Sequence, residues 1–190
     1  GIDPIVCAAA FIQAAQTIVS RNLNPFAPGL VSITHVEGGN TWNVIPETVL
    51  VEGTTRSLGK EERQLIRENL CRLAERIAEG HGSQAEIDWY EGPPATDNAP
   101  EWVEVARRLA EQQSFDVAEA PASLGGEDFA YYQETLLGAF VLVGTGHSYS
   151  NHNPKFQVDP AALWPAAQYL VGLAEAALQH ILKGKAGGAK

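Results

Sequence analysis

The chain has 190 residues, of which 45% are hydrophobic and 19% are charged. Its 13 Lys and Arg residues stand against 23 Asp and Glu residues, which gives a formal net charge of −10. This composition predicts a soluble, folded protein of one large or two small domains, and it excludes disorder and collagen-like order. It also argues against nucleic acid or an anionic membrane as a partner, because both require a concentrated cationic face.

Neither a membrane span nor a disulfide framework is predicted. The longest uniformly apolar runs, such as 139–143, are far shorter than the roughly 20 residues that cross a bilayer, and no signal peptide is evident. Cys7 and Cys71 fall within predicted helices, where a thiol packs as a small apolar group. The reducing cytoplasm is therefore the expected location.

Residues 1–91 predict two helices and three strands. Asp3 followed by Pro4 is a helix-entry signal, and apolar residues recur at helical spacing until Asn24 and Pro25 stop the helix. Strands are predicted at 31–38, 48–56 and 85–89, with a long amphipathic helix at 58–79.

The resulting order is helix, strand, strand, helix, strand. It is the order of a ferredoxin-like split βαβ unit without its first strand, so we expect that strand to precede Gly1. The chain also contains no Met, whereas a natural gene product begins with one. We therefore expect a fragment or a processed chain.

A segment rich in turn formers, 92–98, is expected to cross between two domains. Beyond it, a helix opens at Pro100, a glycine-containing loop spans 123–128, and 139–143 is predicted as a strand buried on both faces, as in a parallel sheet. A final helix starts at Asp159 and Pro160, and the tail 183–190 is expected to fray. The apolar stripe of that helix is formed by Leu163, Ala167, Leu170, Ala174, Ala177 and Ile181.

The strongest local signal is the loop 144–156, which directly follows the apolar predicted strand. Ligands collect at the carboxyl ends of strands in open α/β sheets. His152 can bind a metal through one ring nitrogen while Asn153 and Pro154 fix the backbone around it. Spacing alone favours the other interpretation, a surface histidine before a turn, because a lone histidine is common and a metal site needs about three protein ligands.

A second signal is the loop in which Gly125 and Gly126 precede the carboxylates of Glu127 and Asp128. These groups can orient a metal-bound water or a ligand, whereas Asp128 can also simply cap a following helix. A mononuclear metal site formed by His147, His152 and one of these two carboxylates is a further alternative. No partners for a Ser–His–Asp nucleophile are found in this region.

A third signal is the polar turn 38–47 together with the arginine that ends the following strand. Asn43 can read an amide or a carboxylate, and Arg56 can clamp a carboxylate through two hydrogen bonds. A purely structural role in a hairpin explains the same residues, because Asn and Gly tolerate the left-handed backbone of turns. An Arg at the end of a strand is often only solvated.

Five segments, in their order and rough spacing, resemble the metal-dependent amidohydrolases that include hippurate hydrolase and the auxin-conjugate hydrolases. The segments are 1–5, 38–47, 53–56, 125–129 and 152–156. The resemblance covers nearly the whole chain and implies an α/β protein with a catalytic domain and an inserted lid of four strands and two helices. Residues 1–91 would be the lid (dimerisation) domain without its first strand, and 99–182 the carboxyl-terminal part of the catalytic domain.

The resemblance also implies roles for individual residues. His152 matches the family's last metal ligand, and Asn43 matches a lid residue that reaches bound substrate. Arg56 matches a nearby position, and the loop containing Gly126 and Glu127 matches a segment that lines the active site. The other metal ligands and the general base of the family lie in its amino-terminal half, so no catalytic residue is expected in this chain.

The implied activity is hydrolysis of the amide bond of an N-acyl amino acid by a metal-activated water, in a homodimer formed through the lid. Two divalent metals would be bound in the parent enzyme, and Zn, Mn, Co and Ni all accept imidazole and carboxylate. The isolated chain is expected to be inactive, because one imidazole cannot hold two cations. The alternative is a non-catalytic dimerisation or small-ligand-binding module.

Overall fold

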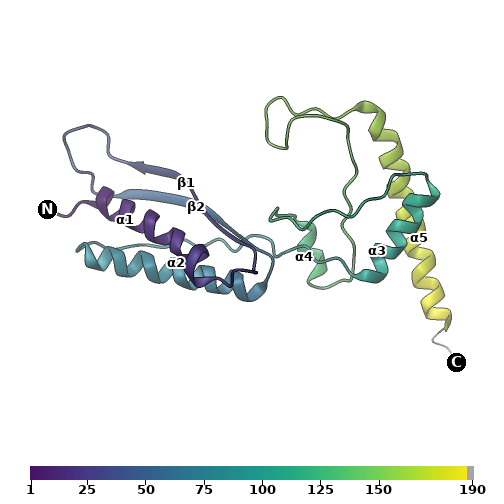
Figure 1. Cartoon of the computed structure of the whole chain (residues 1–190), viewed down its shortest axis with the longest axis horizontal. Coiled ribbons are helices and arrows are strands. Elements are labelled where there is room, and N and C mark those ends of the chain that lie inside the picture. Colours follow the sequence, from purple (N-terminus) through teal and green to yellow (C-terminus); the bar gives the residue numbers. More distant parts are fainter. Residues whose placement is uncertain (188–190) are drawn as a thin grey trace. The chain divides into compact units, whose positions relative to one another are not determined.

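A computed structural model describes residues 1–187 and shows a mixed α/β protein (Figure 1). The chain forms two compact units. Unit 1 comprises residues 1–95 together with the loop 123–128, and unit 2 comprises residues 96–122 and those from Phe129 onward. The division after Ala95 falls within the segment 92–98, which the sequence predicts as a crossing.

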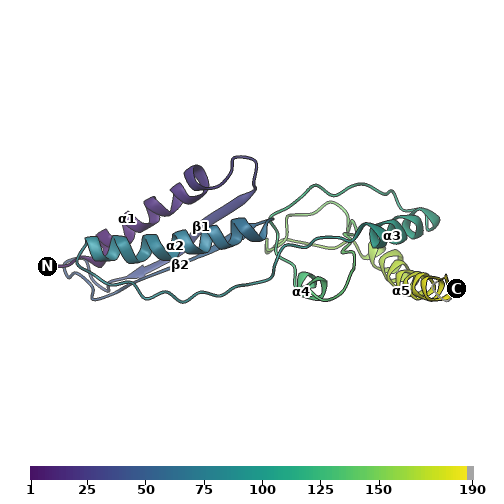
Figure 2. The ribbon, with the colours of Figure 1, turned by 90° about the horizontal axis from the view of Figure 1, so that it is seen from below.

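Unit 1 consists of two helices packed against an antiparallel hairpin (Figures 1 and 2). Its elements are α1 (Pro4–Thr17), which continues as the π-helical turn η1 (Ile18–Asn22), β1 (Gly29–Gly38), β2 (Val49–Ser57) and α2 (Lys60–Gly80). The start of α1 is as predicted, because Oδ1 of Asp3 accepts hydrogen bonds from the amides of Ile5 at 2.9 Å and Val6 at 3.3 Å.

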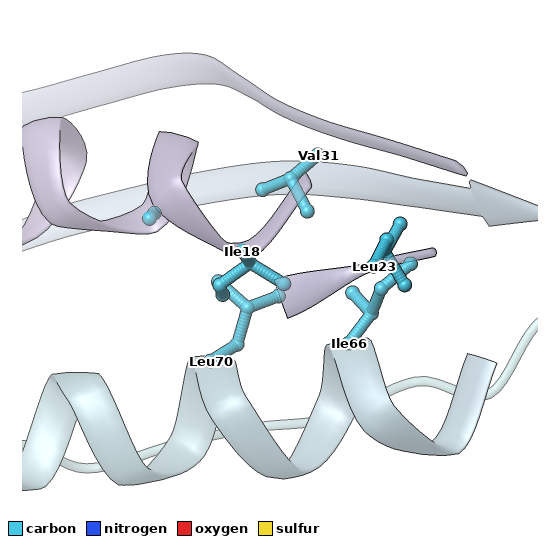
Figure 3. Close-up of a cluster of buried hydrophobic side chains, with 6 residues drawn as sticks. Ile18, Leu23, Val31, Ile66 and Leu70 are labelled. Carbon is cyan, nitrogen blue, oxygen red and sulfur yellow. The ribbon is translucent and has the colours of Figure 1, made fainter. Parts of the chain in front are cut away.

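The core of unit 1 lies where η1 meets α2 and β1. Ile18 and Ile66 are fully buried, and Leu23, Val31 and Leu70 pack around them (Figure 3). Figure 3 shows Ile18 and Leu70 pointing toward each other from their two helices. Each buried side chain of this size stabilises the fold by about 1.5–3 kcal/mol, so this cluster holds the helices on the hairpin.

The helix Pro4–Asn22 has 19 residues and a mean hydropathy of 1.2, which by length and composition is enough to cross a membrane. The core helices of soluble proteins pass the same test. In unit 1, Ala15 and Ile18 of this helix are fully buried in the cluster against α2 and β1.

The third strand predicted for unit 1, at 85–89, is wrong. Residues 84–91 pair with no strand within the described part of the chain, so the sheet has two strands, β1 and β2. The segment still contributes an apolar side chain to the core, since Trp89 packs against it. The guanidinium of Arg67 lies over the Trp89 ring, 5.7 Å from the ring centroid. A strand requires a neighbour for its backbone hydrogen bonds, which an alternating pattern alone does not supply.

Unit 2 is built on two helices that lie against each other, α3 (Pro100–Gln112) and α5 (Leu163–Gly187). The short helix α4 (Phe129–Gln133) lies between them in sequence, and the turn η2 (Pro160–Ala162) leads into α5. Tyr169 ties the two long helices together, because its buried hydroxyl donates a hydrogen bond to the carbonyl of Ala106 at 2.9 Å. α5 extends beyond the predicted end near 182, and of the tail expected to fray, residues 188–190 lie outside the described residues.

The predicted parallel strand at 139–143 is also wrong. Figure 1 draws the chain between α4 and α5 without a strand, and no strand is found in residues 96–187. The backbone of Phe140 is held by one side chain: its amide donates to Oδ1 of Asn98 at 2.7 Å, and its carbonyl accepts from Nδ2 of Asn98 at 2.9 Å. A buried parallel strand needs strands beside it, and the described residues of unit 2 contain none.

Tyr169 gives unit 2 a stability that depends on pH. Burial raises the pKa of its hydroxyl above the ordinary value. The buried neutral phenol therefore contributes fully to the free energy of unfolding below the unfolded pKa of about 10, and that contribution is lost as the pH rises through the folded pKa. We expect Tyr169→Phe to lower the unfolding free energy of unit 2 by about 1 kcal/mol at neutral pH, because the hydrogen bond is lost. The variant should also lack the decrease in unfolding free energy that titration of the Tyr169 hydroxyl causes at alkaline pH. Urea unfolding followed by circular dichroism at neutral pH and near pH 10.5 measures both effects; an unaltered alkaline loss in the variant would contradict the assignment.

Candidate functional site

Arg56 and Gly126 are far apart in sequence, but they meet within unit 1. Arg56 lies near the end of β2, where it pairs across the hairpin with Leu30. A β-carbon built on Gly126 would collide with Nη1 of Arg56 and would lie 3.3 Å from Cζ. The guanidinium therefore lies against the backbone of residue 126, which is possible because this residue has no side chain.

The guanidinium of Arg56 is available to a ligand. Within the described part of the chain no carboxylate forms an ion pair with it. The loop beside it is shaped locally, because Gly125 donates its backbone N–H to Oγ of Ser123 at 3.1 Å. A half-buried, unpaired guanidinium next to a bare stretch of backbone can bind a carboxylate through two parallel hydrogen bonds.

Glu127, the other predicted substrate-binding residue of this loop, is exposed beside Gly126. Among the described residues it joins no ion pair, with Arg56 or with any other cation. The structure therefore brings Arg56 to the glycine of the loop and leaves the neighbouring carboxylate facing solvent.

Asn43 lies in the exposed turn that connects β1 to β2. Its Oδ1 accepts a hydrogen bond from Oγ1 of Thr41 at 3.2 Å, and the neighbouring Trp42 is 94% exposed. The turn joins the Gly38 and Val49 ends of the strands, whereas Arg56 lies at the other end of the hairpin. Arg56 lies seven positions after Val49 along β2, which corresponds to roughly 23 Å. Asn43 and Arg56 of one chain therefore do not share a site for a small molecule.

His152 is exposed in the loop that precedes α5, and its backbone is left-handed with a φ of 68°. Two hydrogen bonds close the loop: the amide of Asp159 donates to the carbonyl of Thr145 at 2.9 Å, and the amide of Gln157 donates to Oγ of Ser148 at 2.7 Å. A left-handed conformation costs a residue other than glycine about 1–2 kcal/mol. Such conformations are concentrated at functional sites, which favours a role for this imidazole over a chance surface position.

The described residues do not build a metal centre by themselves. No group of three or more His, Cys, Asp or Glu side chains lies close enough to hold an ion in this part of the chain. The mononuclear alternative, which combines His147 and His152 with Glu127 or Asp128, draws on residues of both units and stays a prediction. His152 alone can offer one ring nitrogen to a metal whose other ligands come from elsewhere.

Comparison with known proteins identifies related sequences. The family model described as peptidase family M20/M25/M40 matches residues 6–176. An N-acetylcysteine deacetylase of Bacillus subtilis is 42% identical over 180 residues, which covers 95% of this chain and 47% of the relative. An N-acetyldiaminopimelate deacetylase of Leuconostoc mesenteroides is 32% identical over 167 residues, with 87% and 44% covered. The chain thus spans about half the length of the curated relatives it matches.

A solved structure agrees with these relationships. It is a Bacillus subtilis protein described as a dinuclear metal binding peptidase from the M20 family. It superposes on this chain with a TM-score of 0.75 at 39% sequence identity, covering 94% of this chain and 47% of that protein. The similarity extends over both units, and again over about half of the relative.

Proposed function

Because the chain belongs to peptidase family M20/M25/M40, a family of metal-dependent hydrolases, we propose that it supplies the substrate-binding part of an amidohydrolase that cleaves N-acyl amino acids. The observation that carries this proposal is the unpaired guanidinium of Arg56 lying on the backbone of Gly126. The single imidazole of His152 is its second contribution.

Arg56 binds the α-carboxylate of the substrate. Every N-acyl α-amino acid carries an α-carboxylate at a fixed number of bonds from its scissile amide, so anchoring that carboxylate places the amide carbonyl for attack. Gly126 sets the position of the guanidinium, because any side chain at residue 126 would occupy its place. A bidentate hydrogen bond between two charged groups contributes about 1.5–3 kcal/mol to binding.

The acyl group of the substrate is acetyl. Two relatives are described as deacetylases, one acting on N-acetylcysteine and one on N-acetyldiaminopimelate. These substrates share an acetamide next to an α-carboxylate and differ in their side chains. We therefore place acetyl amino acids ahead of the benzoyl substrate hippurate.

The residues of this chain do not fit a pair of metal ions without further ligands, since His152 is one imidazole and no cluster accompanies it in the described residues. Bound metal supplies an activated water in such enzymes. The residues of this chain have roles other than activating the water. Arg56 holds the substrate carboxylate, Gly126 leaves room for the guanidinium, and His152 offers a ring nitrogen to a metal.

We also propose a homodimer formed through the lid, and the placement of the polar residues supports it. Asn43 and Arg56 lie at opposite ends of the hairpin in one chain. If both contact the same small substrate, Asn43 must come from a second copy. The exposed side chains of Trp42 and Val44 next to Asn43 give this turn an apolar surface for such a contact.

A grafted enzyme tests the proposal. In it, the matched segment of the Bacillus subtilis N-acetylcysteine deacetylase is replaced by this chain. We expect the grafted enzyme to release acetate from N-acetyl-L-cysteine when Mn²⁺ or Zn²⁺ is added, and hippurate to be the poorer substrate. A folded, metal-loaded graft that hydrolyses no N-acyl amino acid would refute the proposed function.

A further inference from the structure

The helices α3 and α5 lie against each other in unit 2 (Figure 1), and a groove of about 260 Å³ opens between them. Its lining comes from residues 105–112 of α3 and residues 176–183 of α5. Pockets for drug-sized ligands enclose roughly 300–1,000 Å³, so this groove has room for a smaller molecule. Because its walls come from two helices, one ligand can contact a different group on each of them.

The groove is cationic in a chain that is acidic overall. The chain carries 23 Asp and Glu residues against 13 Lys and Arg residues. Among the described residues that line the groove, however, Arg108 and Lys183 are charged and none is a carboxylate. A local concentration of cations attracts anions even when the net charge of the protein is negative.

Both cations have hydrogen-bond donors to offer. Nε of Arg108 donates to Oε1 of Glu104, one turn earlier on α3, at 2.6 Å. This bond orients the guanidinium and uses one of its five N–H groups, so the terminal nitrogens remain for another acceptor. Glu104 offsets part of the charge of Arg108, whereas Lys183 joins no ion pair within the described part of the chain.

Polar side chains next to these cations add further donors. The imidazole of His180 lines the groove and is held by the ring of Trp102, with 5.2 Å between the ring centroids and an angle of 65° between the planes. An imidazole carries an N–H donor in its neutral and its charged form. The amides of Gln112 and Gln179 also line the groove. The lining therefore suits a ligand that accepts hydrogen bonds at more than one end.

The apolar part of the lining favours one class of anion. Val105, Leu109 and Ala176 line the same groove and are half-buried. Phosphate is polar on every side and would leave these side chains without an apolar contact. A dicarboxylate with a short methylene chain has apolar surface between two charged ends, and carboxylates match the geometry of a guanidinium.

We propose that the groove between α3 and α5 is a binding site for a small aliphatic dicarboxylate. One carboxylate binds the guanidinium of Arg108, the other binds the ammonium of Lys183, and the methylene chain packs on the apolar side chains between the helices. None of the residues that we propose to bind substrate or metal lines this groove. The proposal therefore does not depend on the proposed function.

Calorimetric titration of the full chain with glutarate tests the site. At an ionic strength of about 20 mM, where charge interactions are weakly screened, we expect saturable binding with a Kd below about 10 mM. Valerate, which has the same carbon chain but one carboxylate, should bind at least about fivefold more weakly, and so should inorganic phosphate. In NMR spectra of the labelled chain, the largest shifts on adding glutarate should be at Arg108, His180 and Lys183.

Single charge removals locate the ligand. Arg108→Gln and Lys183→Gln should each raise the Kd for glutarate at least about fivefold, because each removes the partner of one carboxylate. Arg107→Gln is the matched control. It removes the same charge from the neighbouring position of α3, where Arg107 pairs with Glu119 at 3.5 Å and does not line the groove, so the Kd should change less than about twofold. Circular dichroism should show the helix content of the unaltered chain in Arg108→Gln and Lys183→Gln, since both side chains are exposed.

Several results would overturn the proposal. A Kd for glutarate above about 10 mM would remove the site, and valerate or phosphate binding within fivefold of glutarate would remove its preference for dicarboxylates. An unchanged Kd in Arg108→Gln or in Lys183→Gln would place the bound glutarate elsewhere. An equal loss in Arg107→Gln and Arg108→Gln would show attraction by the general charge of the helix rather than contact within the groove.

Discussion

Replacement of His152 by alanine in the grafted enzyme is expected to lower kcat/KM for N-acetyl-L-cysteine by about a thousandfold, or ~4 kcal/mol of transition-state stabilisation. The reason is that a metal centre that loses one of its few protein ligands binds its ion less tightly and positions the activated water less well. Initial rates at saturating Mn²⁺, together with the metal content of the purified protein, measure both consequences.

Two matched variants separate ligation from loop structure. His147→Ala removes the other imidazole of the same loop and should change kcat/KM less than about threefold. His152→Gly accommodates the left-handed backbone at residue 152 without strain, whereas alanine there retains the cost of about 1–2 kcal/mol. If both His152 variants lose activity equally, the imidazole is the cause. Full activity in either of them would remove His152 from the metal centre.

Substitution of Gly126 by alanine is expected to raise KM for N-acetyl-L-cysteine about thirtyfold while kcat changes less than about threefold. The added β-carbon takes the place of Nη1 of Arg56, so the guanidinium moves and its two hydrogen bonds to the α-carboxylate lose their geometry. Since the displaced group is the end of a flexible side chain, the stability of unit 1 should be nearly unchanged.

The neighbouring glycine is the control for this prediction. A β-carbon on Gly125 would meet only Oγ of Ser123, at an ordinary 3.5 Å, so Gly125→Ala should leave KM as it is. Arg56→Lys should raise KM like Gly126→Ala, and the double variant should add little to either change. With N-acetylcysteamine, which has no carboxylate, Gly126→Ala, Arg56→Lys and their double variant should have the same KM as the parent enzyme. A KM increase that persists on that substrate would show that Arg56 does not bind the carboxylate.

The helices and the hairpin of this chain were predictable because their signals are local. Asp3 and Pro4 define the start of α1 through hydrogen bonds within one turn, and the spacing of Ile66 and Leu70 places both on the buried side of α2. The strands expected at 85–89 and 139–143 failed for one shared reason. A strand depends on a partner that its own residues do not encode, and neither segment has one within residues 1–187.

The candidate site was predictable as a set of residues but not as an arrangement. Arg56 and Gly126 were each identified, yet their contact depends on how loop 123–128 folds back onto unit 1, which no spacing in the sequence reveals. The left-handed backbone of His152 was likewise missed. Asp159 was recognised as the start of a helix, whereas its amide also closes the His152 loop on Thr145.

The most direct test of the account is the rate of N-acetyl-L-cysteine hydrolysis by this chain alone and by the grafted enzyme, measured side by side with added Mn²⁺ or Zn²⁺. The account predicts no turnover above background for the chain alone, because His152 is the one metal ligand proposed in it, and metal-dependent turnover once the rest of the M20 architecture is present. Metal-dependent turnover by the chain alone would contradict it, since the reaction centre would then lie wholly within these residues.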